Sequence, residues 1–288
     1  EVRRLATSLP DRATLETVLD VAARAPSLRN LQPWRWRVGA DAIHLYADWS
    51  RVSGDSLSDR RDVLLGCGAV LDHCEVALAA AGWAPRVRRF PDRNDDSHLA
   101  VLEVIEQPPL DGQLELASAI PRRRADRRPY PAQRIDPATL ELFYIRAARM
   151  GVAFGVVPRS RWDRLEDATV ALRYPSGAGE QSVEPADNAV LLVLGTERDD
   201  DDARLRAGEA LSHLTLTATA MGLASCPLTD PLNDTASRLA LACEVFDGEA
   251  RPQVLIRVGL RPSGADPVPA TERRPVNETT TWADSVIR

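Results

Sequence analysis

The stretch ATLETVLDVAARAPSLRNLQPWRW, residues 13–36, decides the fold because its first half occurs twice in the chain. The second copy is ATLELFYIRAARMG, residues 138–151, which starts 125 residues later. The polar tail of the first copy, APSLRNLQPW at residues 25–34, has no counterpart. A helix that recurs in this way indicates a chain of two similar halves, of which only one keeps the turn that follows the helix.

A second and longer repeat supports the two halves. Residues 66–85, GCGAVLDHCEVALAAAGWAP, match residues 206–227, RAGEALSHLTLTATAMGLASCP, with Gly68 aligned to Gly208. Both segments are predicted to form long helices, and each helix ends in a glycine, the usual residue just beyond a helix C-terminus. Small residues permit close backbone approach, so we expect two central helices packed together.

Strand-like runs occur at matching places in the two halves. They are residues 35–38, 42–48 and 99–105 in the first half, and residues 152–157, 188–195 and 252–260 in the second. We therefore predict an α+β fold of two pseudo-symmetric halves, equivalent to a fused dimer, with long central helices packed against mixed sheets. The predicted N-terminal half is residues 1–110 and the C-terminal half is residues 111–288, with an extra loop or lid near residues 168–188.

Composition excludes several classes of protein. A hydrophobic content of 44% is enough for a globular core. The sequence contains no charge-free run of 18 apolar residues, so it predicts no membrane span. The net charge of −6 argues against a nucleic-acid partner, because such binding relies on neutralising phosphates. The four cysteines have no metal-ligand spacing, which favours reduced thiols in the cytoplasm. All 36 basic residues are arginine, so any phosphate site must use guanidinium groups.

The usual catalytic and nucleotide-binding motifs are missing from the sequence. It contains no GxGxxG, no GxxxxGK[ST], no HExxH and no EF-hand loop. The four histidines are scattered, and His73 and His213 occupy equivalent positions in the repeated helices, which is typical of core histidines. We therefore predict no catalytic side chain and no metal site.

Two arginine groups occur in the second half alone. They are PRRRADRRPY at residues 121–130 and ATERRPV at residues 270–276. Solvated basic loops would explain either group by itself. The asymmetry favours a binding site, because the two arginine groups occur in one half and the polar turn occurs in the other. Pro26 and Pro33 constrain that turn on both sides.

Together these segments resemble the nitroreductase superfamily of FMN proteins. The resemblance lies in AARAPSxxNxQPW at residues 22–34, RxxxR at residues 124–128, GLxSCP at residues 222–227 and RRP at residues 273–275. It covers most of the chain when the chain is divided into two fused copies. The sequence is more closely similar to the actinobacterial Acg-type members.

The resemblance implies one FMN per chain, bound between the halves. The implied FMN-binding residues are Pro26, Ser27 and Asn30 from the first half and Arg124, Arg128, Pro227, Leu228, Thr229, Arg273 and Arg274 from the second. In this assignment the arginines hold the phosphate, and a backbone N–H near Thr229 points at flavin N5. Asp126 falls where the family often has Ser or Thr.

The resemblance leaves three hypotheses for function. In the first, NAD(P)H reduces the FMN, which then reduces a nitroaromatic, a quinone or a similar small acceptor. In the second, the chain stores or sequesters FMN under a lid near residues 168–188 and turns over little or no NAD(P)H. In the third, the protein binds no flavin and serves in protein interactions. We expect a cytoplasmic monomer without a nucleic-acid or membrane partner, and the sequence does not choose between NADH and NADPH.

Overall fold

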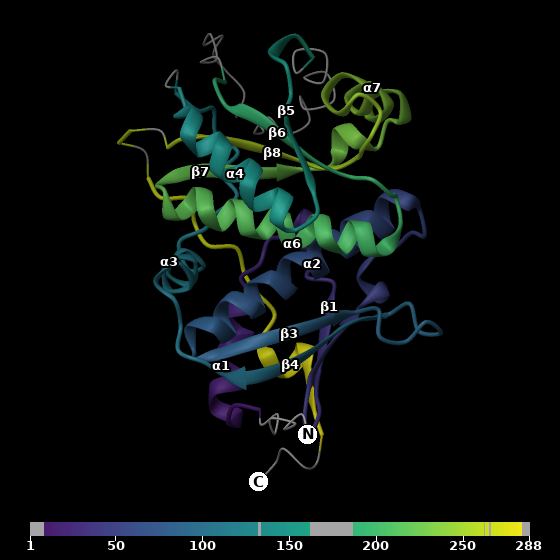
Figure 1. Ribbon diagram of the computed structural model, residues 1–288, viewed down its shortest axis with the longest axis vertical. Coiled ribbons are helices and arrows are strands. Elements are labelled where there is room, and N and C mark those ends of the chain that lie inside the picture. Colours follow the sequence, from purple (N-terminus) through teal and green to yellow (C-terminus); the bar gives the residue numbers. More distant parts are fainter. Residues whose placement is uncertain (1–8, 132–133, 162–186, 262, 265, 284–288) are drawn as a thin grey trace, which may run out of the picture.

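The computed structural model describes residues 9–131, 134–161, 187–261, 263–264 and 266–283. Two halves lie on either side of a central layer formed by α2 and α6 (Figure 1). The loop or lid expected near residues 168–188 lies outside the described residues, apart from its last two positions.

The helices are α1 (Arg12–Ala22), α2 (Leu57–Ala80), α3 (Asp111–Ala119), α4 (Pro137–Arg149), α6 (Asp201–Ala220), α7 (Thr235–Phe246) and α8 (Val276–Thr279). The strands are β1 (Trp34–Val38), β2 (Ile43–Ala47), β3 (Trp83–Arg89), β4 (His98–Glu106), β5 (Ala153–Val156), β6 (Val190–Thr196), β7 (Leu223–Leu228), β8 (Arg251–Leu260) and β9 (Thr280–Trp282). Short 3-10 turns are η1 (Leu28–Asn30), η2 (Trp49–Arg51) and η4 (Asp230–Leu232).

The repeated helices begin at side-chain caps. Asp11 accepts a hydrogen bond from the backbone of Thr14 at the start of α1, and Asp136 does the same for Ala138 at the start of α4. These carboxylates satisfy N–H groups that have no partner inside the helix. α1 ends before Pro26, as the sequence predicts. The long helices α2 and α6 begin at Leu57 and Asp201, earlier than the repeat alone indicates.

The two sheets have the same strand order. The first sheet has the order β3-β4-β2-β1-β9. The second sheet has the order β7-β8-β6-β5, which is the same order when the four strands of each half are counted along the chain, with β9 as an additional strand of the first sheet. Neighbouring strands are antiparallel except for the parallel pair of β1 with β9. This shared order confirms the prediction of an α+β fold with two pseudo-symmetric halves.

The central helices cross at a pair of glycines. A Cβ atom placed on Gly68 would lie 2.0 Å from the carbonyl oxygen of Leu205, and one on Gly208 would lie 2.3 Å from that of Leu65. At this crossing, α2 places Leu65 in the hydrophobic core of the second half, and α6 places Leu205 in the hydrophobic core of the first half. The crossing confirms the expected close contact of two helices rich in small residues.

α2 is long and apolar enough to cross a membrane by length and composition alone. In the described structure it is instead a core helix, because 89% of its most apolar window is buried against other parts of the chain.

The C-terminal segment returns from the second half to the first. After β8 the chain passes along the boundary between the halves and ends as β9 beside β1 (Figure 1). Here Thr280 is in register with Trp36. The division at residue 110 stays a prediction, but the topology shows that residues 276–282 pack on the first half.

Candidate functional site

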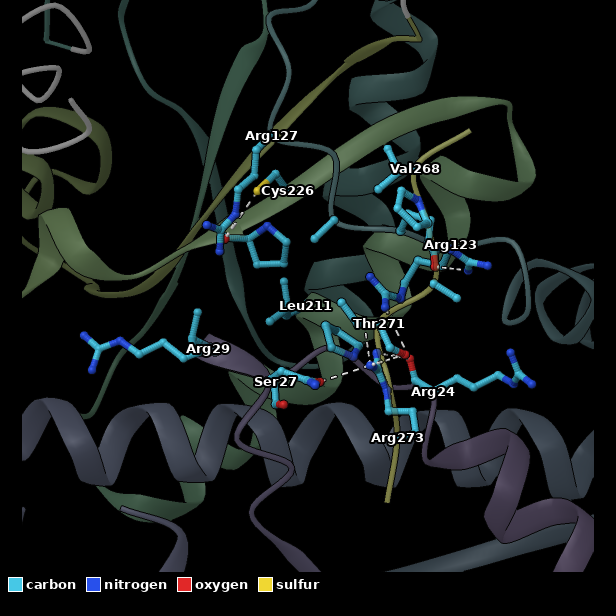
Figure 2. Close-up of a pocket in the computed structure, with 18 residues that line it drawn as sticks. Arg24, Ser27, Arg29, Arg123, Arg127, Leu211, Cys226, Val268, Thr271 and Arg273 are labelled. Atoms are coloured by element: carbon cyan, nitrogen blue, oxygen red, sulfur yellow. Dashed lines mark hydrogen bonds between the residues drawn. The ribbon is translucent and has the colours of Figure 1, made fainter. Parts of the chain in front are cut away.

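A pocket of about 400 Å³ lies between the two halves (Figure 2). The first half contributes the turn after α1, which includes Ser27 and Asn30. The second half contributes the segment after α3, the end of β7 near Pro227, and the C-terminal segment up to Arg273. A cavity of this size suits a small organic ligand.

Four arginines of the second half line the pocket, and three of them have guanidinium nitrogens that are buried and form no ion pair with a described carboxylate. They belong to Arg123, Arg124 and Arg273. Nε and Nη1 of Arg123 and Nε of the other two are buried without a hydrogen-bond partner among the described residues. Arg123 and Arg124 each donate through one Nη atom to backbone carbonyls, such as Arg123 to Arg24 at 3.2 Å. Arg273 donates through both Nη atoms, to backbone carbonyls and to the side chains of Asn30 and Thr271.

These arginines repel one another. Burial, and then the charges of Arg273 and Arg124, lower the pKa of Arg123 to about 9. Arg123 itself is only 4% exposed. Burial and the neighbouring Arg124 and Arg24 lower the pKa of Arg273 as well. A buried cation that lacks a partner is costly, so the arrangement favours an anionic ligand that would accept these unused donors.

The turn after α1 has a strained backbone. Arg29, Asn30 and Gln32 have φ values of 52°, 55° and 49°, in the left-handed region that residues other than glycine rarely adopt. The hydroxyl of Ser27 accepts a hydrogen bond from the backbone N–H of Gln32 at 3.0 Å and closes the turn. Such strain persists where surrounding contacts fix the backbone, and it is common at functional sites.

The C-terminal segment supplies many of these contacts. The Asn30 amide donates to the carbonyl of Glu272 at 3.0 Å and accepts from Nη1 of Arg273 at 3.0 Å. The Gln32 side chain accepts from the backbone N–H of Arg274 at 2.7 Å. The polar turn of the first half is thus bonded directly to the late arginine segment of the second half.

The segment after α3 runs along β7. The N–H of Asp126 donates to the carbonyl of Ser225 at 2.9 Å, beside an isolated parallel bridge between Ala125 and Ser225. Side chains of an extended segment alternate between its two faces. Accordingly Ala125 and Arg127 face the pocket. Arg128 points away from the pocket and forms an ion pair with the carboxylate of Asp126 at 2.7 Å.

No family model matches the chain. Among curated proteins, one from Mycobacterium tuberculosis named "Putative NAD(P)H nitroreductase Rv3131" is 39% identical, over 98% of this chain and 95% of that protein. A second, "Putative NAD(P)H nitroreductase acg" from the same organism, is 33% identical over 92% of this chain and 94% of that protein. The chain belongs to the nitroreductase family.

A solved structure supports the family fold. The crystal structure of a "putative nitroreductase" from Anabaena variabilis matches 88% of this chain and 90% of its own, with a TM-score of 0.58 and 10% sequence identity. The nitroreductase-like fold that the resemblance implied is therefore confirmed over most of the chain.

The structure gathers most of the predicted site residues at one pocket. Pro26, Ser27, Asn30, Arg124, Pro227 and Arg273 all line it. These residues come from both halves of the family fold, so the pocket lies at the expected boundary.

The other predicted residues lie beside the pocket. Arg128 is bonded to Asp126, as described above. Arg274 points into the first half, where its Nη1 contacts the carbonyl of Gln32 at 3.3 Å. Leu228 and Thr229 are buried at the end of β7 and do not line the pocket wall.

Sequence reasoning missed four arginines of the pocket, namely Arg24, Arg29, Arg123 and Arg127. The family pattern RxxxR selects Arg124 and Arg128 from a run of five arginines, and its spacing carries no information on side-chain direction. The contact of this run with β7 separates Arg127, which lines the pocket, from Arg128, which does not.

A buried polar network between α2 and α6 lies outside the pocket. The Ser212 hydroxyl donates to Asp72 at 2.5 Å and lies 2.7 Å from Nδ1 of His73, while His213 contacts the other oxygen of Asp72. Burial lowers the pKa of His73 to about 3. His73 is therefore neutral near pH 7, and the network joins the halves at equivalent helix positions. In the described part of the chain, no three His, Cys, Asp or Glu side chains form a metal-binding group.

Proposed function

We propose that the chain is an FMN-binding flavoprotein that uses NAD(P)H to reduce small nitroaromatic or quinone-type acceptors. The carrying observation is the set of three guanidinium groups around one pocket without a described carboxylate partner. Membership of the family, whose relatives are named as NAD(P)H nitroreductases, supports the proposal.

The residues present fit the phosphate end of FMN. A phosphate monoester offers three acceptor oxygens and nearly two negative charges. The unpartnered nitrogens of Arg123, Arg124 and Arg273 offer matching donors on one wall of the pocket. Charged hydrogen bonds of this kind are stronger than neutral ones, and guanidinium groups can make them in pairs.

The remaining walls suit the flavin ring. Pro26, Leu28, Leu211 and Pro227 provide apolar surface at the pocket, and Ser27 adds a hydroxyl. FMN, when bound, would supply the hydride and electron chemistry, and the protein would supply binding, orientation and exclusion of water. A protein acid or base is not required. Contacts from Leu228, Thr229, Arg128 and Arg274 stay predictions.

The alternative function is storage or sequestration of FMN. It depends on a lid near residues 168–188, which falls outside the described residues apart from its last two positions. We further propose that a monomer is sufficient, because both walls of the pocket come from one chain. The cytoplasmic location expected from the four unpaired cysteines stays a prediction.

One experiment separates these functions. The purified protein is analysed for FMN content and then mixed anaerobically with NADPH or NADH while flavin absorbance is followed. We expect about one FMN per chain and bleaching by a nicotinamide. Bleaching by dithionite alone would favour storage, and a protein that neither retains nor binds added FMN would overturn the flavoprotein proposal.

A further inference from the structure

A histidine on α2 has a ring nitrogen that the proposed function does not yet explain. His73 is completely buried, and its Nε2 has no hydrogen-bond partner among the described residues. Such an unpaired atom is rare in a core, because burying a polar group without a partner costs free energy. The contact with Ser212 accounts for the other ring nitrogen, Nδ1, and leaves Nε2 unused.

The network between α2 and α6 determines which ring nitrogen carries the proton. Ser212 has a single hydroxyl hydrogen, which it donates to Asp72 at 2.5 Å. The Ser212 oxygen therefore accepts from Nδ1 of His73 at 2.7 Å, so Nδ1 is protonated. Because burial lowers the pKa of His73 to about 3, the ring carries no second proton near neutral pH. Nε2 is thus a lone pair that can only accept a hydrogen bond.

The pocket arginines lie close to this ring. After burial, the charge of Arg123 is the next cause that lowers the pKa of His73, and the charge of Arg273 acts in the same direction. Leu211, which precedes Ser212 in α6, lines the pocket itself. The ring of His73 therefore lies behind the wall that carries the proposed phosphate donors.

Arg123 has the donors that this acceptor lacks. One of its nitrogens, Nη2, donates to the carbonyl of Arg24, while Nε and Nη1 have no partner among the described residues. A guanidinium group carries five N–H donors in one plane, so it can bond to two partners along different edges. A neutral acceptor leaves the positive charge available for a phosphate, whereas a carboxylate in the same place would offset it.

We propose that His73 is a positioning residue of the phosphate site, whose Nε2 accepts a hydrogen bond from Arg123 and holds that guanidinium group toward the FMN phosphate. This inference rests on the proposed function, because it concerns the phosphate end of the same ligand. Ser212 and Asp72 contribute indirectly by keeping the proton on Nδ1. No part of this network touches the flavin ring in the proposal.

The test compares FMN with riboflavin, which lacks the phosphate. Fluorescence titration of the flavin-free protein gives both affinities, and their ratio reports on the phosphate site alone. In His73→Asn, the shorter amide can replace Nδ1 but does not reach the position of Nε2. We expect FMN affinity to fall about tenfold and riboflavin affinity to stay within about twofold of wild type. A purely structural role would weaken both flavins alike.

Two further variants make the assignment specific. His73→Gln has a longer amide, which can place an oxygen near the position of Nε2, and it should recover most of the FMN affinity. His213 occupies the equivalent position in α6, but it contacts Asp72 and lines a separate cavity that contains none of the pocket arginines. His213→Asn should therefore keep the wild-type ratio of the two affinities.

A measurement on the unaltered protein covers variants that do not fold. In protein with ¹⁵N-labelled histidine, His73 is recognised by nuclear magnetic resonance as the imidazole that stays neutral to the lowest pH, because it is buried. Its Nε2 should give the signal of an unprotonated nitrogen. Addition of FMN should shift this signal, and addition of riboflavin should not.

The outcomes separate the two proposals. Equal losses for FMN and riboflavin in His73→Asn, a proton on Nε2, or a signal that FMN leaves unchanged would overturn the role of His73 and leave the flavoprotein intact. A protein that binds neither flavin overturns both proposals.

Discussion

Arg123 is a cation that the fold places almost completely out of water. Its Nε and Nη1 have no partner among the described residues, and burial with two neighbouring arginines lowers its pKa to about 9. In a ligand-free protein this arrangement is destabilising, because a buried charge needs compensation. The burial of this charged side chain is therefore best explained by the binding of an anion, and not by a contribution to folding stability.

Replacing Arg123 should separate binding from stability. In Arg123→Met, we expect FMN affinity to fall about 10- to 100-fold, the range for a lost charged hydrogen bond. The melting temperature of the FMN-free protein should not fall, because a buried unpaired charge is removed. Fluorescence titration with FMN and calorimetry measure the two effects.

The neighbouring arginine provides the control. The side chain of Arg122 is exposed, and its hydrogen bonds among the described residues go to Ser118, so Arg122→Met should keep wild-type affinity. Equal losses in the two variants, or an unchanged affinity in both, would contradict the assignment of Arg123 to the phosphate.

The choice among adjacent arginines was beyond the sequence. Residues 121–130 form no regular helix or long strand, so no periodicity shows which side chains face inward. The hydrogen bond of Asp126 to Ser225 fixes the direction of the neighbouring Arg127 and Arg128, and that contact spans 99 positions of the chain. The polar turn was easier to identify, because Pro26 and Pro33 limit it locally.

At the scale of elements, the sequence predicted those with strong patterns, including the edge strand β5, and missed three other edge strands. Both central helices and the inner strands follow from repeats and apolar runs. β3 and β7 were missed, because Pro85 and Pro227 interrupt their patterns. Both are edge strands, where a missing N–H leaves no gap in the ladder. β9 was missed because it has only three residues.

The glycine crossing of α2 and α6 gives a prediction for an element contact. Gly68→Ala would place a methyl group 2.0 Å from the Leu205 carbonyl, so the helices must separate. We expect the free energy of unfolding to fall by at least about 1–3 kcal/mol, the usual cost of overpacking. Chemical denaturation measures this change.

A glycine in open space serves as the matched control. Gly112 lies in α3 with no atom within 4 Å of an added Cβ. Gly112→Ala should therefore be neutral or stabilise the protein by up to about 1 kcal/mol, through helix propensity alone. A stable Gly68→Ala variant would show that the helices have room to move apart.

On the scale of the whole molecule, the C-terminal segment links the site to the fold of the other half. It carries Arg273 past the pocket, bonds to Asn30, and then adds β9 to the first sheet. The position of the pocket arginine thus depends on strand pairing several residues further along the chain.

Removing the end of the chain should show this dependence. A variant that stops after Pro275 keeps Arg273 but loses β9 and the packing of Val276 and Trp282 on the first core. We expect stability to fall by about 2 kcal/mol or more from the lost burial. FMN affinity should fall as well, because the arginine is no longer anchored. Thermal unfolding and FMN titration measure both.

A shorter deletion is the control for this experiment. A chain that stops after Ala283 retains β9 and its pairing with β1. Its melting temperature and FMN affinity should match those of the full chain. If both deletions behave alike, the strand does not anchor the site.

The return of the last strand to the first sheet has a consequence for dissecting the protein. A backbone cut near residue 110 would leave a second fragment that still carries a strand belonging to the first, in addition to the crossed helices. The two fragments would therefore bind each other through two separate interfaces, the strand pair and the helix crossing. Co-expressed as a split protein, they should reassemble and regain flavin colour, whereas either fragment alone should stay colourless.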